Sequence, residues 1–143
     1  ILYTRGEVYQ YVGDEIVVSW PFDKGKSHAN CIRCFFEIKE VLQRKSPLYM
    51  EKYGVAPEMK AGLHYGEVLA GEIGVIKRDI TYTGDVLNTA SRIQSMCNSL
   101  GVDILLSKNL FDTLKLAPDQ YHPERLGAID LRGKSAQMVV YTL

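Results

Sequence analysis

The segment 59–74 constrains the fold most, because it sets four closely spaced glycines among β-forming residues. Residues 59–66 are typical of a strand that leads into a turn, and residues 67–74 of a second strand that returns as its partner. Glycines inside strands usually mark bulges or the close approach of a neighbouring backbone or ligand. We therefore predict a hairpin here with a close contact against it. His64, in the first strand, is predicted to be a packed or hydrogen-bonded side chain without chemistry of its own.

Two more hairpins are predicted toward the ends of the chain. The first covers residues 6–20, where two runs of β-branched and aromatic residues flank the turn pair Gly13-Asp14. The second covers residues 124–141 and turns at 132–135.

Helical spacing of apolar residues marks two long segments. Residues 27–44 begin at Ser27, a suitable N-cap, and are followed by an irregular connector that contains Pro47. Residues 85–100 carry one apolar face and stop at Gly101, a residue that suits the position after a helix end.

A short apolar strand at 102–106 and a short helix from Ser107, its N-cap, to Leu114 complete the pattern. Irregular alternation of helices with hairpins favours an α+β fold, in which helices pack against a mixed, mainly antiparallel sheet. The 143 residues are long enough for one domain, 1–143, with a sizeable core.

Composition narrows the class of protein. Seventeen Lys and Arg balance seventeen Asp and Glu, so no overall field attracts nucleic acid or an anionic membrane. No apolar run approaches the ~20 residues of a membrane span, and no signal peptide opens the sequence. The three cysteines argue against a secreted disulfide framework. We expect a reducing, cytoplasmic setting, for a free protein or for the cytosolic domain of a membrane-anchored one.

Cys31 and Cys34 form a C-x-x-C pair that has two interpretations. No second Cys/His pair lies nearby at the spacing of a zinc site, and no strand directly precedes the pair as in a redox fold. Both cysteines fall on the apolar face of the predicted helix 27–44. We therefore interpret them as two small core side chains.

Three local features have side chains that suit metal or phosphate binding. Asp14, on a tight turn, is a suitable Mg²⁺ ligand, although Gly-Asp is also ordinary turn chemistry. Asn88 and Arg92 lie four residues apart on the polar face of the predicted helix. An amide beside a guanidinium suits a phosphoryl group or a ribose oxygen, or is simply a solvated face. Arg132 and Lys134, around a glycine turn, suit a polyphosphate or serve only solubility.

The combination of motifs is more specific than any one of them. The chain carries Gly-x6-Gly-Asp-Glu at 6–15, a glycine-rich block at 62–74, and a block at 78–92 that ends in Asn-Thr-Ala-Ser-Arg. Their order and spacing closely resemble the class III adenylate and guanylate cyclases, over nearly the whole chain. The resemblance implies a ferredoxin-like, palm-type class III cyclase fold.

In that family two like or similar domains pair head to tail, and the active sites form across the interface. Two ions, Mg²⁺ or Mn²⁺, bind to two aspartates of one subunit and assist attack of the ribose 3′-hydroxyl on the α-phosphate of a nucleoside triphosphate. By position, Asp14 resembles the second of these aspartates. Asn88 and Arg92 match the pair from the other subunit, which orients the ribose and balances charge at the α-phosphate. Arg132 stands where the family usually has a lysine that binds the terminal phosphates.

One departure from the family pattern concerns the first metal aspartate. It belongs to the family's opening strand, and the chain, which starts at Ile1, has no such segment, as though the first strand and early helices were absent. Asp14 alone supplies little of the charge of a two-metal site. We expect this segment by itself to be inactive and a longer protein to be active.

A second departure concerns the choice of purine. Adenylate cyclases usually have a lysine where this chain has Gln10, with an aspartate or threonine where it has Thr81; guanylate cyclases usually have a glutamate and a cysteine. Amides and hydroxyls both donate and accept hydrogen bonds, and so suit either purine. Thr81 and the lack of a glutamate favour ATP, with guanylate cyclase as the alternative. The plainer interpretation of Gln10 is a strand residue that faces solvent.

Two other classes of protein compete with an enzyme of this kind. A catalytically silent cyclase-like module, which dimerises or regulates a partner, is suggested by the missing first aspartate. The retained Asp14, Asn88 and Arg92 favour the enzyme. A diguanylate cyclase-type palm domain is disfavoured, because residues 12–16 lack the second glycine of its hairpin motif.

Overall fold

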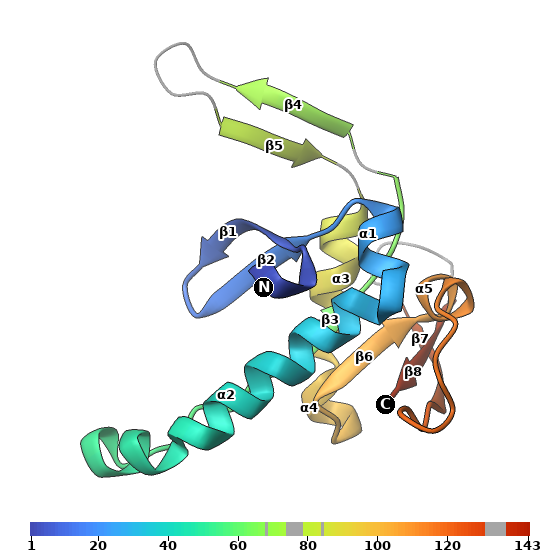
Figure 1. Ribbon diagram of the computed structural model, residues 1–143. Coiled ribbons are helices and arrows are strands. Elements are labelled where there is room, and N and C mark those ends of the chain that lie inside the picture. The colour runs from blue at the N-terminus through green and yellow to red at the C-terminus, as the bar shows by residue number, and fades with distance from the viewer. Residues whose placement is uncertain (68, 74–78, 84, 131–136) are drawn as a thin grey trace. The chain divides into compact units, whose positions relative to one another are not determined.

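The computed structural model describes residues 1–67, 69–73, 79–83, 85–130 and 137–143 (Figure 1). The chain divides into two compact units. The first consists of Ile1–Met59 with Leu114–Leu116, and the second of Lys60–Thr113 with Ala117–Leu143.

The first unit starts with a hairpin and continues into helices. Its elements are, in chain order, η1 (Leu2–Thr4), β1 (Glu7–Val12), β2 (Glu15–Ser19), α1 (Phe22–Lys26), η2 (Ser27–Ala29) and α2 (Asn30–Tyr53). The strands β1 and β2 pair antiparallel, which confirms the hairpin predicted over residues 6–20. The sequence patterns did not predict the short helices η1, α1 and η2.

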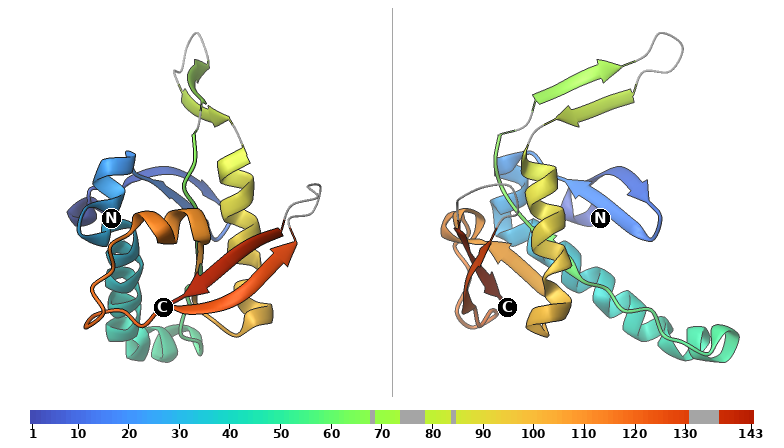
Figure 2. Two further views of the ribbon diagram at one scale, coloured as in Figure 1. Left: turned by 90° about the vertical axis from the view of Figure 1, so that its right-hand side faces the viewer. Right: turned by 180° about the vertical axis from the view of Figure 1, so that it is seen from behind.

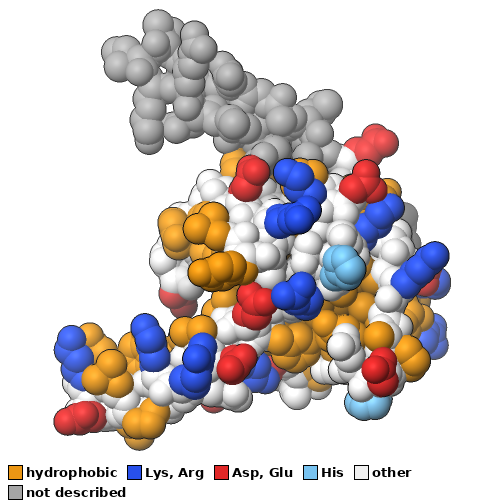
Figure 3. All heavy atoms as spheres, in the orientation of Figure 1, with side chains coloured by type: hydrophobic (Ala, Val, Ile, Leu, Met, Phe, Trp, Pro, Cys, Tyr) orange, Lys and Arg blue, Asp and Glu red, His pale blue; other side chains and the backbone are white. Residues whose placement is uncertain are grey.

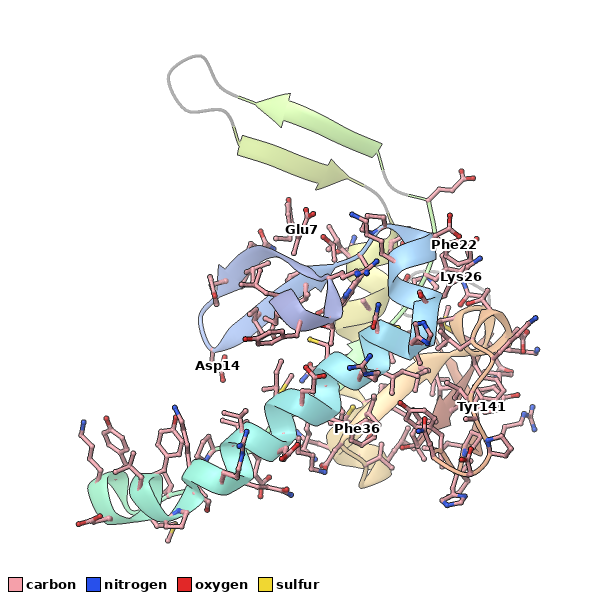
Figure 4. The ribbon with its side chains drawn as sticks, viewed as in Figure 1. Glu7, Asp14, Phe22, Lys26, Phe36 and Tyr141 are labelled. Atoms are coloured by element: carbon pink, nitrogen blue, oxygen red, sulfur yellow. The ribbon has the colours of Figure 1, made fainter. Side chains whose placement is uncertain are left out.

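The turn of this hairpin consists of Gly13 and Asp14 alone, since Val12 pairs with Glu15. Gly13 has a φ of 61°, while Asp14 is not among the described residues with positive φ. This is the pattern of a two-residue type II′ turn, in which glycine takes the first position without strain. The turn therefore holds Asp14 at the tip of the hairpin (Figure 4).

Trp20 joins the start of the unit to the end of β2. Its indole Nε1 donates a hydrogen bond to the carbonyl oxygen of Thr4 over 2.9 Å, and Thr4 is fully buried. A Cβ at Gly6 would lie 2.7 Å from the indole ring. The ring therefore packs directly on the backbone at Gly6, where any side chain would displace it.

The long helix α2 starts later than predicted. Ser27, the expected N-cap, lies in η2, and the two residues after it, His28 and Ala29, have φ values of 50° and 51°. Left-handed backbone cannot continue a right-handed helix. The prediction of Ser27 as N-cap was therefore wrong, because this break separates it from α2.

The helix α2 also extends further than predicted. The expected connector around Pro47 is helical as far as Tyr53, and Gly54, with a φ of 74°, ends the helix. Proline removes one helical hydrogen bond and often stops a helix. Here Gln43 and Pro47 are both exposed, so the carbonyl that loses its partner lies on a face open to water.

The first part of α2 is buried, and its cysteines are core residues. Cys31, Ile32, Cys34 and Phe35 are between 0% and 8% exposed, and both cysteines are free thiols. Burial raises the pKa of the Cys31 thiol to about 11, which keeps it neutral and unreactive near pH 7. The interpretation of this pair as core side chains is confirmed. Further along α2, charged and hydrophobic side chains are interspersed on the surface (Figure 3).

The second unit is built on a four-stranded sheet. Its elements are β3 (Ala61–Leu63), β4 (Leu69–Ile73), β5 (Asp79–Thr83), α3 (Asp85–Ser95), α4 (Cys97–Leu100), β6 (Ile104–Ser107), α5 (Lys108–Thr113), β7 (Glu124–Asp130) and β8 (Gln137–Thr142). The strand order is β3-β6-β8-β7. Only β3 and β6 run parallel in this sheet, and β8 lies antiparallel to both of its neighbours (Figure 2). This mixed, mainly antiparallel sheet confirms the predicted α+β class.

The strand pairing predicted for residues 59–74 was wrong. The strand β3 pairs with β6, and β4 pairs antiparallel with β5. The physical reason lies in β6, whose residues Ile104–Ser107 are all buried. A buried strand needs backbone hydrogen-bond partners along its edges, and β3 supplies them on one side.

The close approach predicted for the glycines is present at Gly62. A Cβ there would lie 2.3 Å from the backbone nitrogen of Gln94 and 2.5 Å from the carbonyl oxygen of Ala90. These separations are far below van der Waals contact. The helix α3 therefore lies directly on the backbone of β3.

The core of the second unit includes side chains of α3, α4 and the sheet, namely Ile93, Cys97, Leu105, Ile129 and Val140. The predicted helix 85–100 is interrupted at Met96, between α3 and α4, and ends at Gly101 with a φ of 67° as predicted. The backbone N–H of Leu110 donates to Ser107 Oγ over 3.4 Å, which confirms Ser107 as the N-cap of α5.

The contact at Gly62 predicts a large loss of stability for Gly62→Ala. The added methyl would meet backbone atoms, which cannot move aside as a side chain can, so we expect the free energy of unfolding to fall by about 2–3 kcal/mol. Urea denaturation followed by circular dichroism measures the loss. Gly101→Ala is the control: no atom lies within 4 Å of its Cβ and only its φ of +67° is strained, so about 1 kcal/mol is expected. An equal loss at both positions would contradict the contact.

Burial of Cys31 predicts slow alkylation in the folded protein. With a pKa of about 11, the thiolate fraction at pH 8 is about one in a thousand, and the side chain is also shielded. Iodoacetamide labelling followed by mass spectrometry should leave Cys31 unmodified in native buffer and modify it fully in urea. Rapid labelling in native buffer would contradict the buried position.

Candidate functional site

The helix α3 presents Asn88 and Arg92 together. Thr89 and Ile93, on the inner side, are 3% and 0% exposed, whereas Asn88 is exposed and Arg92 is half-buried. Residues four apart lie one above the other on a helix. The amide and the guanidinium therefore share one outer face, as the sequence predicted.

Close packing holds this helix at two points of the second unit. Near its middle, Ala90 and Gln94 rest on the backbone of Gly62. Near its start, Val86 rests on Gly66, because a Cβ at Gly66 would lie 2.8 Å from Val86 Cγ2. Both glycines belong to the motif that the sequence analysis singled out.

Asp14 and Gln10 lie together on the hairpin of the first unit. Asp14 is exposed at the turn and its side chain points away from the hairpin (Figure 4). Gln10, on β1, is also exposed and pairs with Val17 beyond a bulge in the register. Both side chains are thus open to a ligand, and the solvent-facing interpretation of Gln10 matches its exposure.

Two predicted site residues remain, Thr81 and Arg132. Thr81 lies on β5, where its backbone pairs with Gly71. Arg132 lies outside the described residues. The structure therefore brings the predicted residues together in two sets, Asn88 with Arg92 in the second unit and Asp14 with Gln10 in the first.

The hard-cation site predicted at Asp14 stays a prediction. A carboxylate oxygen on a rigid turn suits Mg²⁺ or Mn²⁺. In the part of the chain that the structure describes, no group of three or more His, Cys, Asp or Glu side chains could hold a metal ion. Asp14 itself offers one exposed carboxylate.

Sequence reasoning missed a polar side chain that holds the segment after β3. Asn109 donates a hydrogen bond from Nδ2 to the carbonyl oxygen of Tyr65 over 2.7 Å. His64 Nδ1 and Ser107 Oγ lie 2.9 Å apart, which confirms His64 as a hydrogen-bonded residue. Asn109 follows the predicted strand 102–106 and the predicted N-cap Ser107. This position was the only signal for Asn109 in the sequence.

The described helices include none that is long and apolar enough to cross a lipid bilayer. This finding concerns the described residues only.

Comparison with known proteins places this geometry in a family. The sequence profile described as "Adenylate and Guanylate cyclase catalytic domain" matches residues 4–143. Adenylate cyclase 2 of Rhizobium meliloti (strain 1021) is 36% identical over 143 residues, which cover 100% of this chain and 39% of that protein. The chain thus spans well under half the length of this relative.

Solved structures agree on the fold. A bacterial light-regulated adenylyl cyclase superposes with a TM-score of 0.79 at 23% identity, over 99% of this chain and 40% of its own. The adenylyl cyclase CyaB from P. aeruginosa gives a TM-score of 0.79 at 20% identity, over 98% of this chain and 72% of its own. With the profile match over nearly the whole sequence, these likenesses show that the chain belongs to the class III adenylate and guanylate cyclase catalytic domains.

Proposed function

We propose that the protein converts ATP to 3′,5′-cyclic AMP and pyrophosphate. The observation that carries the proposal is the pairing of Asn88 and Arg92 on the outer face of α3, held there by backbone contacts. The 36% identity to a protein named adenylate cyclase 2 supports the choice of reaction. In this reaction the ribose 3′-oxygen bonds to the α-phosphorus, the bond from that phosphorus to the β-phosphate bridge breaks, and pyrophosphate leaves.

The side chains of α3 suit the reacting end of the substrate. The guanidinium of Arg92 is a permanent, planar cation that can donate two hydrogen bonds to the α-phosphate, where negative charge builds up in the transition state. The Asn88 amide can hydrogen-bond the ribose and hold the 3′-hydroxyl in line with the leaving group. Both side chains reach a ligand without rearrangement of the helix.

Asp14 is proposed to hold Mg²⁺ or Mn²⁺ together with a second carboxylate. Such ions, when bound, lower the pKa of the 3′-hydroxyl and neutralise charge on the leaving pyrophosphate. The type II′ turn keeps the Asp14 carboxylate exposed and fixes its backbone. Arg132 is proposed to bind the terminal phosphates, where a fork of N–H donors suits a polyphosphate.

Gln10 and Thr81 are proposed to contact the purine. An amide and a hydroxyl match the N1/N6 edge of adenine, which offers one acceptor and one donor. The exposure of Gln10 on β1 is consistent with this use. GTP is the alternative substrate, since the same groups can also bind the O6/N1 edge of guanine.

The active site is proposed to form between two copies of the domain, paired head to tail. One copy supplies Asp14, and the other supplies Asn88 and Arg92.

Sharing of the site predicts that two inactive variants complement each other. In the full-length protein, Asp14→Asn and Arg92→Ala should each lower kcat by about 100-fold or more, because each removes charge that acts on the phosphates. Each mixed dimer has two sites, of which one is intact. Random pairing makes about half of the dimers mixed. An equimolar mixture should therefore recover about a quarter of the wild-type rate.

Cyclic nucleotide release from ATP, measured for each variant and for equimolar mixtures after subunit exchange, tests this expectation. Two copies of the same variant form the control. No recovery in the mixture would contradict a shared site. A wild-type protein without product would instead support a silent module, and an Arg92→Ala variant as active as the wild type would refute the proposed role of Arg92.

The choice of purine is tested by side-by-side assays of the full-length protein with ATP and GTP. We expect kcat/KM to be larger for ATP by at least about tenfold, the range that one or two matched polar contacts provide. Thr81→Cys should narrow this preference. A higher kcat/KM for GTP in the wild-type protein would overturn the assignment to adenylate cyclase.

A further inference from the structure

The backbone that follows β3 is held by side chains rather than by a strand. Residues 64–66 continue past β3 without strand pairing. His64 lies against Ser107 of β6, with Nδ1 and Oγ 2.9 Å apart. The Nδ2 group of Asn109 donates to the carbonyl oxygen of Tyr65 over 2.7 Å. We call His64, Ser107 and Asn109 the corner clamp, because they join this segment to the corner between β6 and α5.

The Ser107 hydroxyl uses all of its hydrogen-bonding positions. Its proton is donated to Asn109 Oδ1, an amide oxygen that only accepts. It accepts from the backbone N–H of Leu110 over 3.4 Å, and this N–H also donates to Asn109 Oδ1 over 3.0 Å. The second lone pair then accepts from His64, so the imidazole proton lies on Nδ1. Ser107 is 0% exposed, so water cannot replace a partner that is removed.

The clamped segment contacts the start of α3 in space. A Cβ at Gly66 would lie 2.8 Å from Val86 Cγ2, so the first turn of the helix rests on this backbone. Val86 faces Gly66, and a residue two positions later lies about 200° around an α-helix. Asn88 is accordingly turned outward and exposed.

The later part of α3 has a separate support. Ala90 and Gln94 rest on Gly62, inside the regular strand β3. Arg92 lies between them in sequence. Loss of the clamp should therefore release the first turn of the helix, with Asn88, more than the turn that carries Arg92.

We propose that the corner clamp is a positioning device for Asn88. It fixes residues 64–66, these fix Val86, and Val86 sets the rotation of the first turn of α3. The inference rests on the proposed function, in which Asn88 holds the ribose. None of the three clamp residues touches substrate in this scheme, and each acts through Asn88.

The first test removes the clamp without removing the site. In the full-length protein, Ser107→Ala should lower kcat for ATP by about tenfold and leave KM within about twofold, because misorientation of a bound group acts on the chemical step. Asn109→Ala should act in the same direction, and Asn109 is exposed, so this variant keeps the test valid if Ser107→Ala does not fold. Thr142→Val is the matched control, since it removes the hydroxyl bond of 2.9 Å to Ile104 at the other end of β6. An equal effect of the control and the clamp variants would overturn the proposal.

The second test asks which residue the clamp acts through. In an Asn88→Ala background, Ser107→Ala should change kcat by less than about twofold, because the group that it positions is gone. In an Arg92→Ala background, Ser107→Ala should still lower kcat by about tenfold. The same loss in both backgrounds would show a general structural role and refute positioning of Asn88.

A third measurement does not depend on activity. In an α-helix the N–H groups of Thr89 and Ala90 pair with carbonyls of the first turn, so Ser107→Ala should speed their hydrogen exchange by about tenfold. Exchange near Ile93 should stay unchanged, and Thr142→Val should leave both regions unchanged. If the wild-type protein made no cyclic nucleotide, the proposed function would fail, yet this measurement would still decide whether the clamp holds the first turn. Unchanged exchange at Thr89 and Ala90 would refute the clamp itself.

Discussion

The second unit depends on a contact between two backbones, where α3 lies on β3 at Gly62. A helix this close to a strand is held by main-chain atoms that cannot repack, so its position is defined more sharply than by interlocking side chains. The face of α3 that bears Asn88 and Arg92 is therefore also fixed in position relative to β3. The buried residue Ile93 then fixes the rotation of the helix, because it is 0% exposed. A reacting group benefits from such support, since small displacements reduce catalysis strongly.

Hydrogen bonds from side chains hold the segment that follows the end of β3. Beyond Leu63 the backbone has left the sheet, and Asn109 donates a hydrogen bond to the carbonyl oxygen of Tyr65. Ser107 lies 2.9 Å from the His64 ring, and it also caps α5. One buried hydroxyl thus links the segment after β3 to the start of a helix.

Much of the fold was predictable from local patterns. The hairpin at Gly13-Asp14, the N-cap at Ser107 and the helix stop at Gly101 all depend on residues within a few positions of one another. Predictions failed where the start or end of a helix depended on more than its local sequence pattern. The helix expected over residues 27–44 in fact continues through Pro47 to Tyr53. This is possible because Pro47 lies on an exposed face, where the carbonyl without a helical partner is accessible to water. Ser27 was expected to cap a helix that starts only after the left-handed backbone at His28.

The family, the apolar face of α3 and the shared face of Asn88 and Arg92 were predictable from the sequence, because motif spacing and helical periodicity are local properties of the chain. The pairing of β3 with β6, rather than with its neighbour in sequence, was not predictable in this way. A strand edge pairs with whichever partner satisfies the most buried backbone, and that partner lies 43 positions away at Ala61 and Ile104. The same long-range choice brought Ser107 and Asn109 to the segment after β3, which no local pattern could specify.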